Sequence, residues 1–160
     1  MIRSKSLGLI LAAAATSPLS AATITFDDVS LSGVNSIYTS VTSAGYDFNG
    51  GHFHLINNPA FSGTVGDGTV HLGAEAVPGF GQPVTFTKAG GGAFSLQKAD
   101  IAEFWLPGNS LDNFASVMFT GNLSGGGVLS QTFTLDGIRD GNGGVADFQT
   151  VTFSGWTNLV

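Results

Sequence analysis

Apolar and polar residues alternate along most of this chain, and no long stretch places apolar residues at the spacing of an amphipathic helix. Alternation with a period of two is typical of strands that bury one face, because successive side chains point to opposite sides. Phenylalanine and β-branched residues fill many of the apolar positions, which suits a pleated surface. We expect strands or strand pairs in 23–29, 46–57, 69–76, 83–89, 93–104, 114–123, 128–137 and 148–156.

Clusters of glycine separate these stretches, and the chain contains 24 glycines in 160 residues. "AGGGA" at 89–93 and "SGGG" at 124–127 are interpreted as hairpin turns, because they lack the Lys and Ser/Thr of a phosphate-binding loop. Short strands joined by glycine-rich turns are typical of an antiparallel sandwich or barrel. The pattern predicts one all-β domain, without a repeat of fixed period or an internal linker.

The first residues have a different composition. Arg3 and Lys5 precede an apolar run from Leu7 to Ala15, and small residues end the segment at Ala22. This order is typical of a cleaved secretory signal peptide, and the apolar run is too short for a membrane span. We therefore divide the chain into a signal peptide, 1–22, and a single β-sandwich domain, 23–160, that is secreted or held at the cell surface.

Charge and cysteine content exclude several classes of function. Without residues 1–22 the chain keeps three of its five Lys and Arg residues and all eleven acidic ones, for a formal charge of −8. Nucleic acid and anionic lipid favour clustered basic residues, so neither is an expected partner. The chain has no cysteine, which excludes disulfides and a thiol nucleophile.

Several segments occur in an order that resembles a known class: "ITFDD", "YDFNGGHFHLINNPAF", "GGGAFSLQKADIAEF", "VMFTGNLSGGGVLSQTFTLDG" and "FQTVTFSGWTNL". The chain resembles secreted PEP-CTERM-class bacterial β-sandwich proteins, which are exported by bacteria that make extracellular polysaccharide. The resemblance implies a jelly-roll, galactose-binding-like sandwich, whose relatives often bind carbohydrate and a structural calcium ion. The sorting tail of the class, with Val-Pro-Glu-Pro, an apolar helix and an arginine cluster, does not occur before Val160.

Two histidines, His52 and His54, are placed one residue apart and should share one face of a strand. His71, with Glu75, could complete a zinc or copper site if the two strands are neighbours. A His-x-His strand is similar to that of the cupins, but the glutamate that follows in cupins is missing here. The alternative, which we favour, is that His52 and His54 face solvent on one side of a strand, while Phe53 and Leu55 pack inward on the other.

Adjacent carboxylates at Asp27 and Asp28 suit calcium, which binds six to eight oxygen ligands. In jelly-roll modules such an ion commonly links an early acidic stretch to the last strand. The alternative is a turn in which Asp bonds to nearby backbone. The loop "LDGIRDGNGGVAD" (135–147) lacks the EF-hand pattern and is interpreted as an acidic hairpin loop.

The two tryptophans, Trp105 and Trp156, are candidate platforms for stacking a sugar ring, with burial in the core as the favoured alternative for each. No Gly-x-Ser-x-Gly elbow is present, and nothing indicates that the two glutamates, Glu75 and Glu103, converge as in a glycosidase. We expect a non-catalytic protein associated with polysaccharide. The alternative is a metal-dependent cupin-like enzyme or a polysaccharide-cleaving jelly roll.

The end of the chain prompts one more expectation. By the resemblance, a further strand would follow "FQTVTFSGWTNLV" and pair near "ITFDD". Without that strand a sheet edge would lie open, and open edges favour self-association. The sequence thus predicts a domain that lacks its last strand and associates through an edge.

Overall fold

A computed structural model describes residues 21–33, 35–56, 70–74, 83–104, 116–136, 139–140 and 148–160. Every regular element in this described part is a strand, and most of the strand pairings are antiparallel. This confirms the predicted all-β class. The strands are β1 (Asn35–Ser43), β2 (Tyr46–Ile56), β3 (His71–Ala74), β4 (Thr85–Lys88), β5 (Lys98–Ile101), β6 (Glu103–Phe104), β7 (Ser116–Asn122), β8 (Val128–Thr134), β9 (Arg139–Asp140) and β10 (Gln149–Thr152).

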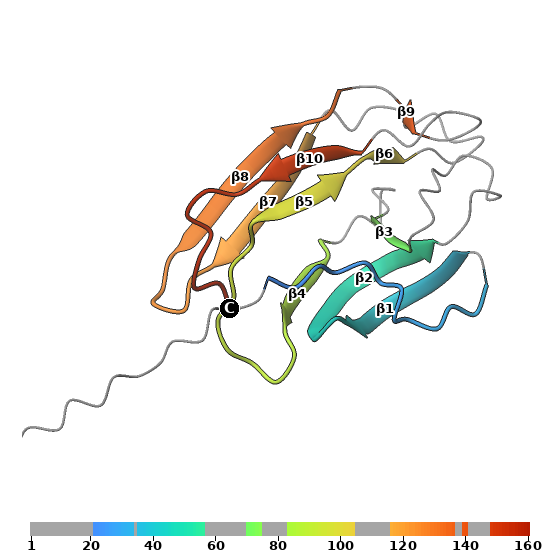
Figure 1. Cartoon of the computed structure of the whole chain (residues 1–160), viewed down its shortest axis with the longest axis horizontal. Coiled ribbons are helices and arrows are strands. Elements are labelled where there is room, and N and C mark those ends of the chain that lie inside the picture. The colour runs from blue at the N-terminus through green and yellow to red at the C-terminus, as the bar shows by residue number, and fades with distance from the viewer. Residues whose placement is uncertain are drawn as a thin grey trace, which may run out of the picture.

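The first sheet is built around β2. Its partner on one edge is β1, joined to it by a two-residue turn at Ala44 and Gly45, which both have positive φ angles. Two shorter strands share the other edge of β2, with β3 beside residues 53–56 and β4 beside residues 46–49. Figure 1 shows these four strands on one side of the molecule.

A bulge bends β2 in its middle. The register between β1 and β2 shifts between Tyr38 and Ser40, so that Thr39 stands against residues 50–52. Because of the shift, Tyr38 and Val41 both pack on the core although they are three residues apart. Strand β1 was missing from the predicted elements for this reason, since its sequence does not alternate with a period of two.

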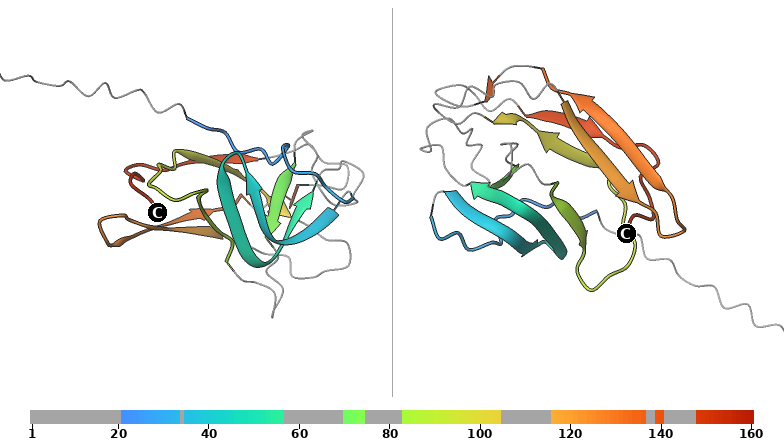
Figure 2. Two further views of the ribbon diagram at one scale, coloured as in Figure 1. Left: turned by 90° about the horizontal axis from the view of Figure 1, so that it is seen from below. Right: turned by 180° about the vertical axis from the view of Figure 1, so that it is seen from behind.

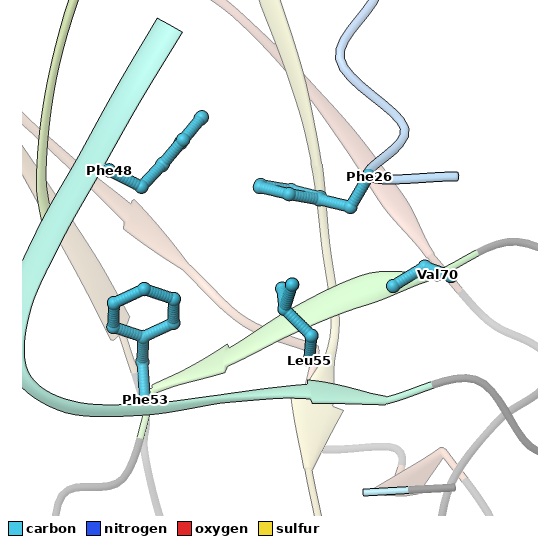
Figure 3. Packing of buried hydrophobic residues seen from close by; sticks show 5 residues of the cluster. All are labelled: Phe26, Phe48, Phe53, Leu55 and Val70. Atoms are coloured by element: carbon cyan, nitrogen blue, oxygen red, sulfur yellow. The ribbon is translucent and has the colours of Figure 1, made fainter. Parts of the chain in front are cut away.

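The buried side chains of the first sheet form a cluster with the N-terminal segment (Figure 3). This first cluster consists of Phe26, Phe48, Phe53, Leu55 and Val70. The rings of Phe26 and Phe48 meet edge to face, with centroids 4.8 Å apart.

The prediction of a strand at 23–29 is wrong. Phe26 has a left-handed φ of 59°, and its carbonyl accepts a hydrogen bond from the Val29 N–H at 3.0 Å. The segment therefore turns at the point where an extended strand was expected. It still contributes Phe26 to the core, because the turn directs that ring against β2.

The second part of the fold has two layers. The β7–β8 hairpin lies over the β5–β10 pair, as the rear view in Figure 2 shows. Phe119 and Phe133 of the hairpin contact Phe153, with ring centroids 4.9 and 5.2 Å apart. We call the buried residues Phe153, Trp156 and Leu159 the second cluster.

Gly121 allows the second cluster to approach β7. A Cβ atom at this position would lie 2.7 Å from Leu159 Cδ2 and 3.1 Å from Trp156 Cζ3. The first distance is shorter than real Cβ contacts and the second is tight, so a side chain here would require Leu159 and Trp156 to shift, and the backbone of β7 forms part of the wall against which Trp156 packs.

The "AGGGA" segment carries the chain from the first part to the second. Strand β4 pairs with β2, not with β5, so the prediction of a hairpin turn at 89–93 is wrong. Gly90, Gly91 and Gly92 all have positive φ angles, a run that residues with side chains rarely adopt. The "SGGG" prediction is confirmed, since residues 124–127 close the β7–β8 hairpin between Asn122 and Val128.

The last described residues are tied to two earlier segments. Leu159 forms β-bridges with both Phe94 and Leu123, and the Val160 N–H donates to the Asn122 carbonyl at 2.9 Å. These bonds fix the chain beyond Trp156 along one edge of β7. None of the described residues belongs to a long apolar helix of the kind that could cross a membrane.

Candidate functional site

His52 and His54 lie on one face of β2, as the spacing predicted, with ring centroids 5.2 Å apart and ring planes at 89°. The expectation that both face solvent is wrong for His54, which is only 8% exposed. Its neighbours Phe53, Leu55 and Ile56 have no exposed surface, so β2 is buried on both faces near its end.

The third histidine belongs to the neighbouring strand. His71 lies opposite Ile56 in the pairing of β2 with β3, and His54 lies opposite Gly73. The backbone of His71 therefore pairs two residues beyond His54 along β2. Glu75 lies outside the described residues, and within those residues no group of three or more His, Cys, Asp or Glu side chains could hold a metal ion.

The acidic pair binds to backbone and hydroxyl groups of its own chain. Asp28 accepts hydrogen bonds from the Ser43 hydroxyl at 2.6 Å and from the Ala44 N–H at 2.8 Å. Asp27 accepts one from the Val70 N–H at 3.0 Å. The two carboxylates thus tie the N-terminal segment to two places, the β1–β2 turn and the start of β3.

These bonds have an electrostatic consequence at Asp28. The Ala44 N–H, followed by the Ser43 hydroxyl, stabilises the charged carboxylate and lowers the pKa of Asp28 from its ordinary value. The chain does turn at the acidic pair, but the carboxylates bond to Ser43, Ala44 and Val70, which are distant in the sequence, and not to nearby backbone as the turn interpretation expected. These bonds do not join the pair to the last residues of the chain, which bridge to Phe94 and Leu123.

The remaining predicted residues divide into two groups. Trp156 is 5% exposed and packs on Phe153 with ring centroids 4.9 Å apart, so it does not present its ring to a sugar. Trp105 lies outside the described residues, as do Asn142 and Asp147 of the acidic loop. Asp136 of that loop is exposed, and the backbone of Asp140 pairs with Phe104 in the short parallel ladder of β6 and β9.

The structure presents one surface that sequence reasoning missed. The outward side of the β7–β8 hairpin consists entirely of exposed, uncharged side chains, which we call the hairpin face. Its members are Ser116, Met118, Thr120 and Asn122 of β7, and Val128, Ser130, Thr132 and Thr134 of β8.

Cross-strand pairing sets these side chains in rows. Met118 pairs with Thr132, and Thr120 pairs with Ser130, in a register that runs from Ser116 to Asn122 without a shift. Met118 and Val128 are 68% and 63% exposed, among the most exposed large apolar residues of the described chain. The signal in the sequence was the absence of Asp, Glu, Lys and Arg from 116–134, which is unusual in an acidic chain.

Comparison with known proteins yields no assignment: no family model, curated protein or solved structure matches this chain.

Proposed function

We propose that this chain is an exported, non-catalytic β-sandwich of the cell surface or extracellular matrix, and that its hairpin face binds a neutral polysaccharide. The observation that carries the proposal is the composition of this face, which combines five hydroxyl groups and one amide group with two exposed apolar side chains.

The chemistry of the face suits a neutral sugar polymer. Serine and threonine hydroxyls and the Asn122 amide both donate and accept hydrogen bonds, as sugar hydroxyls do. Met118 and Val128 offer apolar surface to the C–H groups of a sugar ring. Because the face has no charge, it neither selects an anionic polymer nor repels a neutral one.

The location in the proposal rests on the sequence. Residues 1–22 have the order of charged, apolar and small residues that is typical of a signal peptide. The resemblance to the PEP-CTERM class supports the same location and the association with polysaccharide. The jelly-roll, galactose-binding-like topology belongs to this proposal as well.

A sedimentation assay with insoluble neutral polysaccharides, complemented by a glycan array, tests the function. In Thr120→Val/Thr132→Val two hydroxyls are lost while the shape and strand preference of the side chains are kept. We expect this variant to bind at least several-fold more weakly than the parent. The control Thr87→Val/Thr152→Val changes exposed threonines on β4 and β10 and should bind like the parent.

Two outcomes would refute the proposal. One is that the folded parent protein binds no neutral glycan. The other is that the two double variants lose binding equally, which would place the contact elsewhere.

The second candidate function is a metal-dependent enzyme built on β2 and β3. The observation in its favour is the register that pairs the backbone of His71 with Ile56, two residues beyond His54 along β2. Metal analysis of the purified protein separates the two functions. One zinc or copper ion per chain, lost in His52→Ala, would favour the enzyme, and we expect no such ion.

A further inference from the structure

We propose that strand β8 is the edge through which two copies of this chain associate, by antiparallel pairing of β8 with itself. The inference does not depend on polysaccharide binding, because it concerns the backbone of β8 and not the ligand of the hairpin face.

One side of the β8 backbone has no strand partner among the described residues. Within the described residues β8 pairs only with β7. In an antiparallel pair the residues alternate between those that bond to the partner strand and those that point away. The Leu123 N–H bonds to the Gly127 carbonyl across the hairpin, whereas the Asn122 carbonyl points away from β8 and accepts from Val160.

This alternation assigns the groups along β8. In the pair of Asn122 with Val128, the backbone N–H and C=O groups point away from the partner strand. The same holds at every second residue along the two strands. The N–H and C=O groups of Val128, Ser130, Thr132 and Thr134 therefore face the edge. They form a row of donors and acceptors that a second strand can use.

β8 also lacks the features that normally protect an edge. Charged side chains, prolines and bulges prevent strands from adding to a sheet. β8 has no charge and no proline, and its register with β7 is regular over its whole length. At β1, an edge of the first sheet, the register with β2 shifts between Tyr38 and Ser40, where the extra residues belong to β2.

The occupant is a second copy because the strand is complementary to itself. A two-fold axis at Gln131 places Ser130 opposite Thr132 of the other copy, and Val128 opposite Thr134. Both of these pairs consist of edge-facing residues, which are the ones that form bonds in such a ladder. The strand brings no like charges together, although the chain as a whole is strongly acidic.

The association also continues both faces of the hairpin. Side chains alternate in and out along β8, with Leu129, Gln131 and Phe133 more buried than their neighbours. Pairing in this register keeps each set on its own side. The two hairpins then form one four-stranded sheet, in which the exposed Val128 lies between Asn122 of its own chain and Thr134 of the other copy.

Charge changes at the edge test this arrangement. In Ser130→Lys/Thr132→Lys, each lysine faces a lysine of the other copy, and like charges opposite each other destabilise a ladder. In Ser130→Lys/Thr132→Glu, each lysine faces a glutamate. We expect the first variant to weaken dimerisation about ten-fold and the second to restore it.

A matched control lies one strand away. Met118→Lys/Thr120→Lys places the same charges at the β7 partners of Thr132 and Ser130, on the same face but away from the edge. Sedimentation equilibrium over a range of concentrations measures dimerisation, and circular dichroism shows that each variant is folded. The dimer constant of the control should stay close to that of the parent.

Three results would overturn the proposal. The first is a parent protein that stays monomeric up to about millimolar concentration. The second is an equal loss of dimerisation in the edge variant and the control variant. The third is that the Lys/Glu variant dimerises as poorly as the Lys/Lys variant.

Discussion

The ring of Phe94 meets the ring of Tyr46 edge to face, with centroids 5.4 Å apart. Phe94 also contacts Phe86 at 5.5 Å, and it packs on the second cluster as well. Tyr46 and Phe86 both pack on the first cluster. Phe94 therefore connects the two hydrophobic clusters, just after the chain has passed from one part to the other.

We expect Phe94→Ala to destabilise the domain by about 2 kcal/mol, at the low end for loss of a phenylalanine because this ring is half-buried. The loss should also uncouple the clusters. Two signals during urea unfolding measure this uncoupling: tryptophan fluorescence, and the near-ultraviolet circular dichroism of Tyr38 and Tyr46. Both tyrosines contact the first cluster.

The two unfolding curves should coincide in the parent protein and separate in Phe94→Ala. Phe94→Leu, which keeps part of the contact, should lie between the two. Coincident curves in Phe94→Ala would show that the clusters are coupled by other contacts.

Gly121→Ala should destabilise the domain by about 1–3 kcal/mol, because the added methyl group would overlap Leu159 and the indole of Trp156. The leucine can move, but the ring is held against Phe153. Gly125→Ala is the matched control, since a Cβ atom at Gly125 meets nothing within 4 Å. Equal melting temperatures for the two variants would contradict the close packing of Trp156 on β7.

The sequence predicted best those elements whose pattern is local. Strands β7 and β8 alternate strictly and flank a glycine-rich turn, so pattern and structure agree there. Strand β1 was missed because Tyr38 and Val41 both pack on the core through a register shift in the pairing with β2, which a pattern with a period of two does not reveal. The turn at Phe26 was missed for a similar reason, since Asp27 and Asp28 bond to residues far along the chain.

The candidate sites show the same limit. Spacing alone put His52 and His54 on one face of β2, and that was confirmed. The burial of His54 depends on what covers that face, which spacing cannot reveal. The hairpin face could have been found from its lack of charge, but only after the hairpin was known to be paired in register.

Asp28 should give the domain a pH-dependent stability. Its pKa is lowered in the folded state, so its contribution is present above the ordinary value of 3.8 and is lost as the pH falls through the folded pKa. We expect Asp28→Asn to melt at a lower temperature than the parent near neutral pH. The difference should shrink at pH values below 3.8 as the parent carboxylate is protonated.

Ser43→Ala provides a second measurement, because it removes one of the two donors to Asp28. Its melting temperature near neutral pH should lie between those of the parent and Asp28→Asn. A difference between parent and Asp28→Asn that stays constant down to the acid end would mean that the carboxylate charge is not the cause.

Calcium should have no effect on the melting temperature if the bonds of Asp27 and Asp28 serve only to hold the turn. Both carboxylates already accept hydrogen bonds from the protein. An ion that binds only the native state would raise its stability by mass action. Melting in saturating calcium and in excess chelator tests this, and a calcium-dependent rise that is lost in Asp27→Asn would establish the structural calcium site.

Ala44→Asn should stabilise the domain by about 0.5–1 kcal/mol, because Ala44 occupies a left-handed conformation in the β1–β2 turn. Its φ is 49°, and Gly45 follows with a φ of 81°. Asparagine followed by glycine is the preferred pair for a turn with two positive φ angles. Ala44 is exposed, so the new side chain meets solvent, and its N–H still donates to Asp28.

Urea denaturation measures this gain, and two further variants show whether it comes from the backbone. Ala93→Asn makes the same exchange at an exposed residue without a positive φ, and it should not stabilise the domain. Ala44→Val should destabilise it, since a β-branched side chain is strained at positive φ. If Ala44→Asn and Ala93→Asn shift the midpoint alike, the gain comes from the asparagine side chain and not from the conformation of the turn.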